Sequence, residues 1–186
     1  AAWVAAHFAN KGVEVYSMDV STINPQRAVK NYPFKEHLGV VADVFYLPFQ
    51  EGVFDLIIAS EIIEHVPDPK QFLAQLLPAL APGGKLVVTT PHDEKLAYSL
   101  CVHCNQATPH HGHLHSFTAA SIRALLPEPL RAGARTQTFV NKLLLHARTH
   151  RLLRFFPFQI WRWIDRVFNL ILPKTARLLL VVQRGE

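Results

Sequence analysis

The sequence lacks long apolar runs and is poor in cysteine, and both shortages narrow what the protein can be. No uninterrupted stretch of about 18 apolar residues occurs, so nothing in the sequence clearly spans a membrane. No Gly-x-y period and no heptad run is present, which excludes collagen-like and coiled-coil proteins. The two cysteines, Cys101 and Cys104, have a spacing that suits a metal or redox pair better than secreted disulfides. The N-terminus lacks the charged-then-apolar order of a signal peptide, and we expect a cytoplasmic protein.

The residues that are present fit one folded domain. The chain has 186 residues, of which 49% are hydrophobic and 18% charged, as expected of a single globular domain over 1–186 and not of a disordered chain. Basic charge is concentrated in residues 142–177, which hold eight Lys or Arg and one acid, a net +7, whereas the remainder carries −2. The overall basic charge therefore gives no support to a nucleic-acid partner for the whole domain.

Helical and strand-like stretches alternate along the first 120 residues. Helices are expected at 1–10, 24–31 and 69–80, and strands at 13–19, 39–42, 54–60 and 85–90. A helical turn is expected from Glu61 to His65, where Pro67 interrupts it. This series predicts an α/β fold with a mostly parallel sheet and helices on both faces.

Acidic and polar residues stand at the carboxyl ends of the predicted strands, where parallel sheets bind ligands. Asp19 and Asp43 end two successive strands, and Ser60 and Glu61 end the next. Two acids in these places suit a nucleoside, because one can accept hydrogen bonds from ribose hydroxyls and the other from an adenine amino group. Such acids also cap turns without any ligand, and the spacing alone leaves both alternatives open.

The stretch FDLIIASEIIEHVPDPKQFLAQLLPALAPGGKLVVTTP, residues 54–91, resembles the central motifs of class I S-adenosylmethionine-dependent methyltransferases of the type 11-like group. Upstream, VYSMDVS and VVADVFYLPFQEGVFD resemble the second and third strands of that family. The resemblance covers roughly residues 1–125 and implies a Rossmann-like sheet with an antiparallel last strand, methyl transfer, and S-adenosylmethionine as cofactor. It also implies a cofactor site in which Asp19 binds the ribose and the adenine is contacted from the turn after the third strand, with these members: Asp19, Asp43, Val44 and Ser60.

The sequence departs from the family pattern at its beginning. In the family, a Gly-rich loop after strand one binds the methionine end of the cofactor, whereas Ala1 already belongs to the helix that follows this loop. We expect that the N-terminus is incomplete and that this chain is inactive without the loop. The alternative is a degenerate, non-catalytic relative that serves as a binding protein.

One candidate reactive group is the pattern Glu61-x-x-Glu64-His65. On a helix Glu61 and His65 are one turn apart, and two carboxylates with an imidazole can hold a divalent cation such as Mg²⁺ or Zn²⁺. The pattern resembles the metal site of small-RNA 2′-O-methyltransferases and some quinone-biosynthesis O-methyltransferases, where a histidine two residues before a phenylalanine, here His115, completes the site. A metal-assisted 2′-O-methyltransferase acting on RNA is therefore an alternative function. Without a metal, His65 only packs, or else His65 or His115 is the general base.

A second candidate metal site lies in the His-rich loop at 92–117. Cys101 and Cys104 have the spacing of a zinc knuckle, and His111 and His113 can complete a tetrahedral set. The alternative is a flexible loop that covers the substrate and carries a surface pair of thiols. The histidines of this loop cannot freely serve both candidate sites, so the two metal hypotheses compete.

Residues 135–140 and 177–183 resemble the last two strands of the family, an antiparallel pair, and between them lies a helical insertion at 141–174. Pro157 splits the insertion into two helices, in which leucine, phenylalanine and tryptophan are interleaved with arginine. This pattern is typical of a helix at a membrane surface, and also of a lid or dimer helix whose arginines are solvated. We expect a small-molecule or lipid-like acceptor, membrane contact through 141–174 as one alternative, and no nucleic-acid partner.

Overall fold

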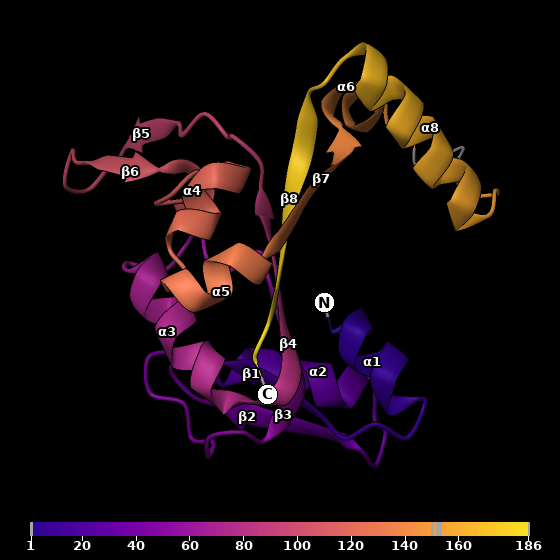
Figure 1. The fold of residues 1–186 in the computed structure, drawn as a ribbon. Coiled ribbons are helices and arrows are strands. Elements are labelled where there is room, and N and C mark those ends of the chain that lie inside the picture. The colour runs from indigo at the N-terminus through magenta and orange to yellow at the C-terminus, as the bar shows by residue number, and fades with distance from the viewer. Residues whose placement is uncertain (1, 150, 152–153, 186) are drawn as a thin grey trace. The chain divides into compact units, whose positions relative to one another are not determined.

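The computed structural model describes residues 2–149, 151 and 154–185, and its contacts divide the chain into two compact units, Ala1–Gln50 and Glu51–Glu186. The described residues form three sheets: a two-stranded sheet in the first unit, and a four-stranded sheet and a hairpin in the second (Figure 1). Helices accompany a mixed sheet that contains parallel strands, so the predicted α/β class is confirmed.

The first unit is a β–α–β arrangement that follows one short helix. Its elements are α1 (Trp3–Ala9), β1 (Val15–Asp19), α2 (Ile23–Asn31) and β2 (His37–Val41). The strands are parallel, and their register places Asp19 beside Val41. Helix α2 packs so closely on β2 that a Cβ at Gly39 would lie 3.2 Å from the Pro25 carbonyl oxygen. This close packing fixes the strands from which the two candidate cofactor carboxylates emerge.

The second unit is built on the sheet β3-β4-β8-β7. Its strands are β3 (Phe54–Ser60), β4 (Leu80–Pro91), β7 (Arg135–Asn141) and β8 (Thr175–Gln183). β3 is parallel to β4, whereas β8 is antiparallel to both β4 and β7, so the predicted antiparallel pair is confirmed. The core of this unit includes side chains of the central strands β4 and β8, where Leu86, Val88 and Leu180 are fully buried.

Five further α-helices belong to the described part of the second unit: α3 (Pro69–Ala79), α4 (Ala119–Ala124), α5 (Glu128–Gly133), α6 (Lys142–His146) and α8 (Phe158–Ile171). Helix α3 begins where the sequence predicts, because the Asp68 carboxylate accepts a hydrogen bond from the Gln71 N–H at 2.9 Å and Pro69 fits the first helical position. Figure 1 shows α3, α4 and α5 on one side of the sheet, with α6 and α8 at the far end of β7 and β8. Pro157 directly precedes α8, as predicted, and residues 150 and 152–153 of the insertion lie outside the described residues.

Two local predictions differ from the structure. The segment from Glu61 to His65 is a turn and not helical, so the expected helical face is wrong: Glu61 has a left-handed φ of 55°, and the His65 N–H donates to the Ile62 carbonyl. The loop at 92–117 also contains regular structure, namely the hairpin β5 (Tyr98–Leu100) and β6 (Ala107–Pro109) and the 3₁₀ turn His110–Gly112.

None of the helices in the described part of the chain combines the length and the apolar character needed to cross a membrane.

Candidate active site

Two carboxylates project from the carboxyl edge of the sheet in the first unit. Asp19, half-buried, accepts hydrogen bonds from the Ser21 N–H at 2.8 Å and from the Asn24 side-chain amide at 3.0 Å. Asp43 is exposed and accepts from the Phe45 N–H at 2.9 Å. These bonds show the turn-capping role that the sequence left open. A carboxylate has about four lone-pair sites, so both side chains keep acceptor capacity for a nucleoside.

The polar side chains at the end of β3 contact two different strands of the sheet, β4 and β8. The Ser60 hydroxyl is 2.9 Å from the Thr89 hydroxyl on β4. Glu61, the first carboxylate of the predicted metal pattern, forms an ion pair with the Arg177 guanidinium on β8. Glu61 is therefore engaged with the sheet and does not belong to the group of potential metal ligands formed by Glu64, His65 and His113.

Glu64 is the buried acid of the site, with only 1% of its surface exposed. Its Oε2 accepts a hydrogen bond from the Thr90 hydroxyl at 3.0 Å, whereas its Oε1 has no hydrogen-bond partner among the described residues. Burial raises the pKa of Glu64 above the ordinary glutamate value, because removal of water disfavours the charged carboxylate. The structure thus contains a desolvated carboxylate oxygen whose bonding capacity is unmet.

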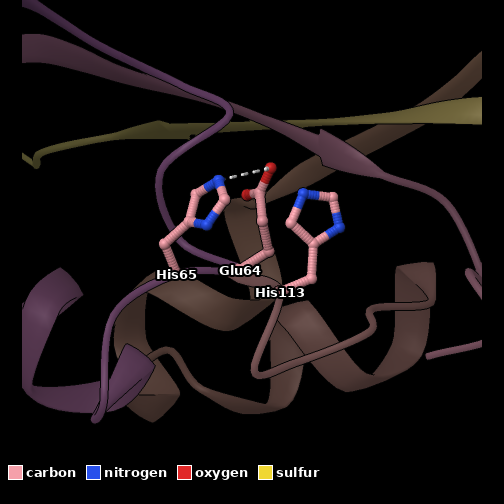
Figure 2. A group of neighbouring side chains, drawn as sticks. All are labelled: Glu64, His65 and His113. Carbon is pink, nitrogen blue, oxygen red and sulfur yellow. Dashed lines mark ion pairs between the residues drawn. The ribbon is translucent and has the colours of Figure 1, made fainter. Parts of the chain in front are cut away.

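Two histidines converge on this carboxylate, as Figure 2 shows. The His65 Nε2 is 4.0 Å from Glu64 Oε1, and its Nδ1 donates to the Gly112 carbonyl at 3.1 Å. His113 comes from the returning loop, and its Nδ1 is held by the Glu94 carboxylate at 2.6 Å. One potential ligand atom from each of Glu64, His65 and His113 lies within 4.8 Å of the other two.

Backbone contacts hold the returning loop against the turn after β3. The Leu114 N–H donates to the Glu64 carbonyl at 2.7 Å, and the His115 Nε2 donates to the Val66 carbonyl at 3.0 Å. His115 therefore acts as an anchor of the loop, and its ring is directed at the backbone. The sequence pattern grouped His115 with Glu61, whereas the structure groups Glu64 and His65 with His113. Glu94, which orients His113, was missed because no local pattern links it to the turn.

The predicted zinc-knuckle residues are not gathered into a cluster. Cys101 and Cys104 lie in the turn between β5 and β6, and within the part of the chain that the structure describes neither belongs to a group of three potential metal ligands. His111 is exposed, with its ring 5.8 Å from the His113 ring. The pKa of the Cys101 thiol is lowered by the backbone N–H groups of His103 and Cys104.

A separate hollow of ≈ 620 Å³ lies between α8 and the outer strands β7 and β8. Apolar side chains such as Phe139, Trp161 and Leu179 line it, together with Arg162 and Arg166. Its one acid, Asp165, is buried and accepts hydrogen bonds from two backbone N–H groups. The hollow is therefore apolar with exposed positive charge beside it.

Residues 2–128 match the family model of the methyltransferase domain, which is more than half of the chain. The chain belongs to this methyltransferase family. Over 50 residues it is 42% identical to a tocopherol O-methyltransferase of Arabidopsis thaliana, a match that covers 27% of the chain and 14% of that protein. Over 47 residues it is 45% identical to the mitochondrial ubiquinone biosynthesis O-methyltransferase of Homo sapiens, covering 25% of the chain and 13% of that enzyme.

The fold agrees with this membership. The structure of Haemonchus contortus phosphoethanolamine N-methyltransferase 2 in complex with S-adenosyl-L-methionine superposes with a TM-score of 0.63 at 15% identity, covering 98% of this chain and 46% of that one. This likeness establishes the Rossmann-like methyltransferase fold that the resemblance implied. The chain matches only a small part of the length of these two relatives, 14% and 13%.

Proposed function

We propose that the protein binds S-adenosylmethionine and transfers its methyl group to a small, amphipathic acceptor. The observation that carries the proposal is the pair of carboxylates at the ends of β1 and β2 in a chain that belongs to the methyltransferase family. Asp19 would accept hydrogen bonds from the ribose hydroxyls, and Asp43 with Val44 would contact the adenine. Ser60, which the resemblance also assigns to the cofactor, stands at the end of β3 in the second unit. The donor and acceptor chemistry fits a nucleoside, because ribose and adenine both present N–H or O–H groups to carboxylates.

Methyl transfer from a sulfonium is a displacement in which the acceptor atom forms a bond to the methyl carbon while the carbon–sulfur bond breaks. The protein contributes positioning and, for a hydroxyl acceptor, removal of a proton. The Gly112 carbonyl can only accept, so Nδ1 of His65 carries the proton and Nε2 holds the lone pair of a base. By the same reasoning the Nδ1 of His115 holds a lone pair, because its Nε2 donates to Val66. His65 and His115 are therefore the proposed general bases.

Calorimetry with S-adenosylmethionine and the full-length protein tests the cofactor site. Asp19→Ala should weaken binding by about 1–3 kcal/mol, the loss expected when ribose donors are left unpaired. Asp19→Asn should lose less, since the amide keeps one acceptor oxygen. The exposed Glu51→Gln serves as a control and should bind as the wild type does. Unchanged affinity in Asp19→Ala refutes the assignment, and failure of the wild type to bind at all favours the non-catalytic alternative.

We further propose that α8 contacts an anionic membrane surface and presents a lipid-like acceptor. Trp163 and Leu170 are seven residues apart on one helical face, and they are 66% and 84% exposed. Arg162 and Arg166 are exposed beside this face, and both of them, like Leu170, also line the hollow between α8 and the outer strands. An apolar face flanked by arginine suits a bilayer interface that carries negative charge.

Sedimentation with anionic vesicles tests the membrane contact. Arg162→Glu combined with Arg166→Glu should abolish binding, and wild-type binding should fall with salt because exposed charges are screened beyond about 8 Å at physiological ionic strength. The matched control is Arg27→Glu with Lys30→Glu, which makes the same change of charge on exposed positions of α2. Equal loss in both double variants points to net charge alone. Wild-type protein that stays in solution with vesicles present rejects the contact.

A further inference from the structure

We propose that Glu64, His65 and His113 form a binding site for one divalent transition-metal ion, for which Zn²⁺ is the probe (Figure 2). All three residues belong to the second unit, and their nearest potential ligand atoms lie within 4.8 Å of one another. The ligands of a tetrahedral zinc stand about 3.4 Å apart, given bonds of about 2.1 Å. Side-chain movements of about 1 Å therefore bring the three atoms onto one ion.

The carboxylate of Glu64 supplies the first independent observation that points to a ligand. It is 1% exposed, and Thr90 holds only one of its two oxygens. The other oxygen, Oε1, has no hydrogen-bond partner among the described residues and lies 4.0 Å from the His65 Nε2. A buried oxygen without a donor is costly, and a cation at this point would satisfy it.

The two histidines supply the second observation, because in both rings Nδ1 is the nitrogen that forms a hydrogen bond. The Nδ1 of His65 donates to the Gly112 carbonyl, and the Nδ1 of His113 donates to the Glu94 carboxylate. A neutral imidazole that donates from Nδ1 carries its lone pair on Nε2. Support of one ring nitrogen by a carbonyl or carboxylate is the usual arrangement around a metal-bound histidine, and it leaves Nε2 as the ligand.

The donor set determines which ion the site would take. Two imidazole nitrogens and one carboxylate oxygen favour Zn²⁺ or another first-row transition ion over Mg²⁺ and Ca²⁺, which prefer oxygen ligands. Glu61 and His115, the other members of the pattern seen in the sequence, are engaged by Arg177 and Val66. The three-ligand set leaves a coordination position open.

The open position gives the site a use that deepens, and rests on, the proposed methyl transfer. Glu64 is bonded to Thr90 near the carboxyl end of β4, the edge at which parallel sheets bind ligands. An acceptor hydroxyl bound to the ion there would lose its proton more readily, because a cation stabilises the alkoxide. The lone pair of His65 would then be held by the metal, which leaves His115 as the base.

Zinc binding to metal-free, full-length protein tests the site by competition with a chromophoric chelator. We expect one equivalent, with affinity reduced at least about 100-fold by Glu64→Gln or His113→Gln and about 10–100-fold by Glu94→Gln, as for ligands and their supports in known sites. His111→Gln is the matched control for the loop histidines and should leave the affinity unchanged. Circular dichroism of each variant confirms that the fold is retained. Wild-type affinity in both Glu64→Gln and His113→Gln overturns the proposal.

A further variant tests whether the cysteine pair, rather than the Glu64, His65 and His113 site, binds the metal. Cys101→Ser combined with Cys104→Ser should bind Zn²⁺ as the wild type does, and the Co²⁺-loaded wild type should show no thiolate-to-metal charge-transfer band. Loss of binding in the cysteine variant, with normal binding in Glu64→Gln, assigns the metal to the hairpin and overturns the proposal. S-adenosylmethionine binding to the same metal-free variants is measured separately, so a failed methyltransferase assignment does not conceal the metal result.

Discussion

Asp165 connects helix α8 to the end of strand β7 through hydrogen bonds, and we expect its replacement to destabilise the protein. The side chain is 6% exposed and accepts hydrogen bonds from the N–H groups of Val140 at 3.1 Å and Asn141 at 2.6 Å. A third bond comes from the Asn169 amide at 3.1 Å. Val140 has a φ of 61°, which is costly for a β-branched residue, so the carboxylate also holds a strained turn in place.

The expected magnitude follows from the two backbone bonds. Asp165→Ala leaves both N–H groups without their acceptor, and hydrogen bonds to a charged group contribute about 1.5–3 kcal/mol each. The free energy of unfolding should therefore fall by about 3–6 kcal/mol, out of about 5–15 kcal/mol for a typical domain. Asp165→Asn keeps one acceptor oxygen and should lose roughly half as much.

Urea unfolding followed by circular dichroism measures this loss, and thermal melting provides a second readout. For a chain of this size about 1 kcal/mol lowers Tm by about 2–4 °C, so Asp165→Ala should melt about 6–24 °C below the wild type. The exposed Asp55→Ala is the control and should stay within about 0.5 kcal/mol. If Asp165→Ala unfolds within 1 kcal/mol of the wild type, the anchoring argument is refuted.

Three further predictions concern the second unit. Gly84→Ala should destabilise by about 1–3 kcal/mol in thermal melting, because the new Cβ would lie 2.8 Å from two backbone carbonyl oxygens; a wild-type Tm contradicts this. Asp68→Ala removes the N-cap of α3 and should lower the urea-unfolding free energy by about 1 kcal/mol, whereas Asp68→Asn should not. Iodoacetamide should alkylate Cys101 from a pH below the ordinary thiol range, because its lowered pKa leaves thiolate present as pH falls; peptide mapping that finds reaction only at alkaline pH disproves it.

The central part of the fold is predictable because its signals are local. The apolar run of residues 54–60 matches β3 in its bounds, although only Ala59 of this strand is buried in the described structure. Asp68 and Pro69 mark the start of α3 because a side-chain acceptor and a fixed φ are both required there. The positions of Asp19 and Asp43 are predictable for the same reason, because residues at the carboxyl ends of predicted parallel strands lie at the edge of the sheet that binds ligands.

The turn after β3 is not predictable in this way. A four-residue spacing predicts a shared face only if the backbone is helical, and the left-handed φ of Glu61 breaks that condition at its first residue. The partner of the turn is also distant in sequence, since the His65 ring bonds the Gly112 carbonyl 47 positions later. Pairings of this range depend on how the 92–117 loop folds back, and the hairpin β5–β6 within it was not foreseen.

The choice among the loop histidines shows what the structure adds to residue type. Composition marks every histidine of the loop as a potential ligand or base, but the bond made by one ring nitrogen decides what the other can do. The His110 Nε2 is engaged by the Ser99 hydroxyl and the His115 Nε2 by the Val66 carbonyl, so both nitrogens already have hydrogen-bond partners. In His65 and His113 the Nδ1 is the engaged nitrogen, which turns each Nε2 lone pair toward the buried oxygen of Glu64. The chemistry available at this edge of the sheet is therefore set by acceptors that no motif contains, a backbone carbonyl and the carboxylate of Glu94.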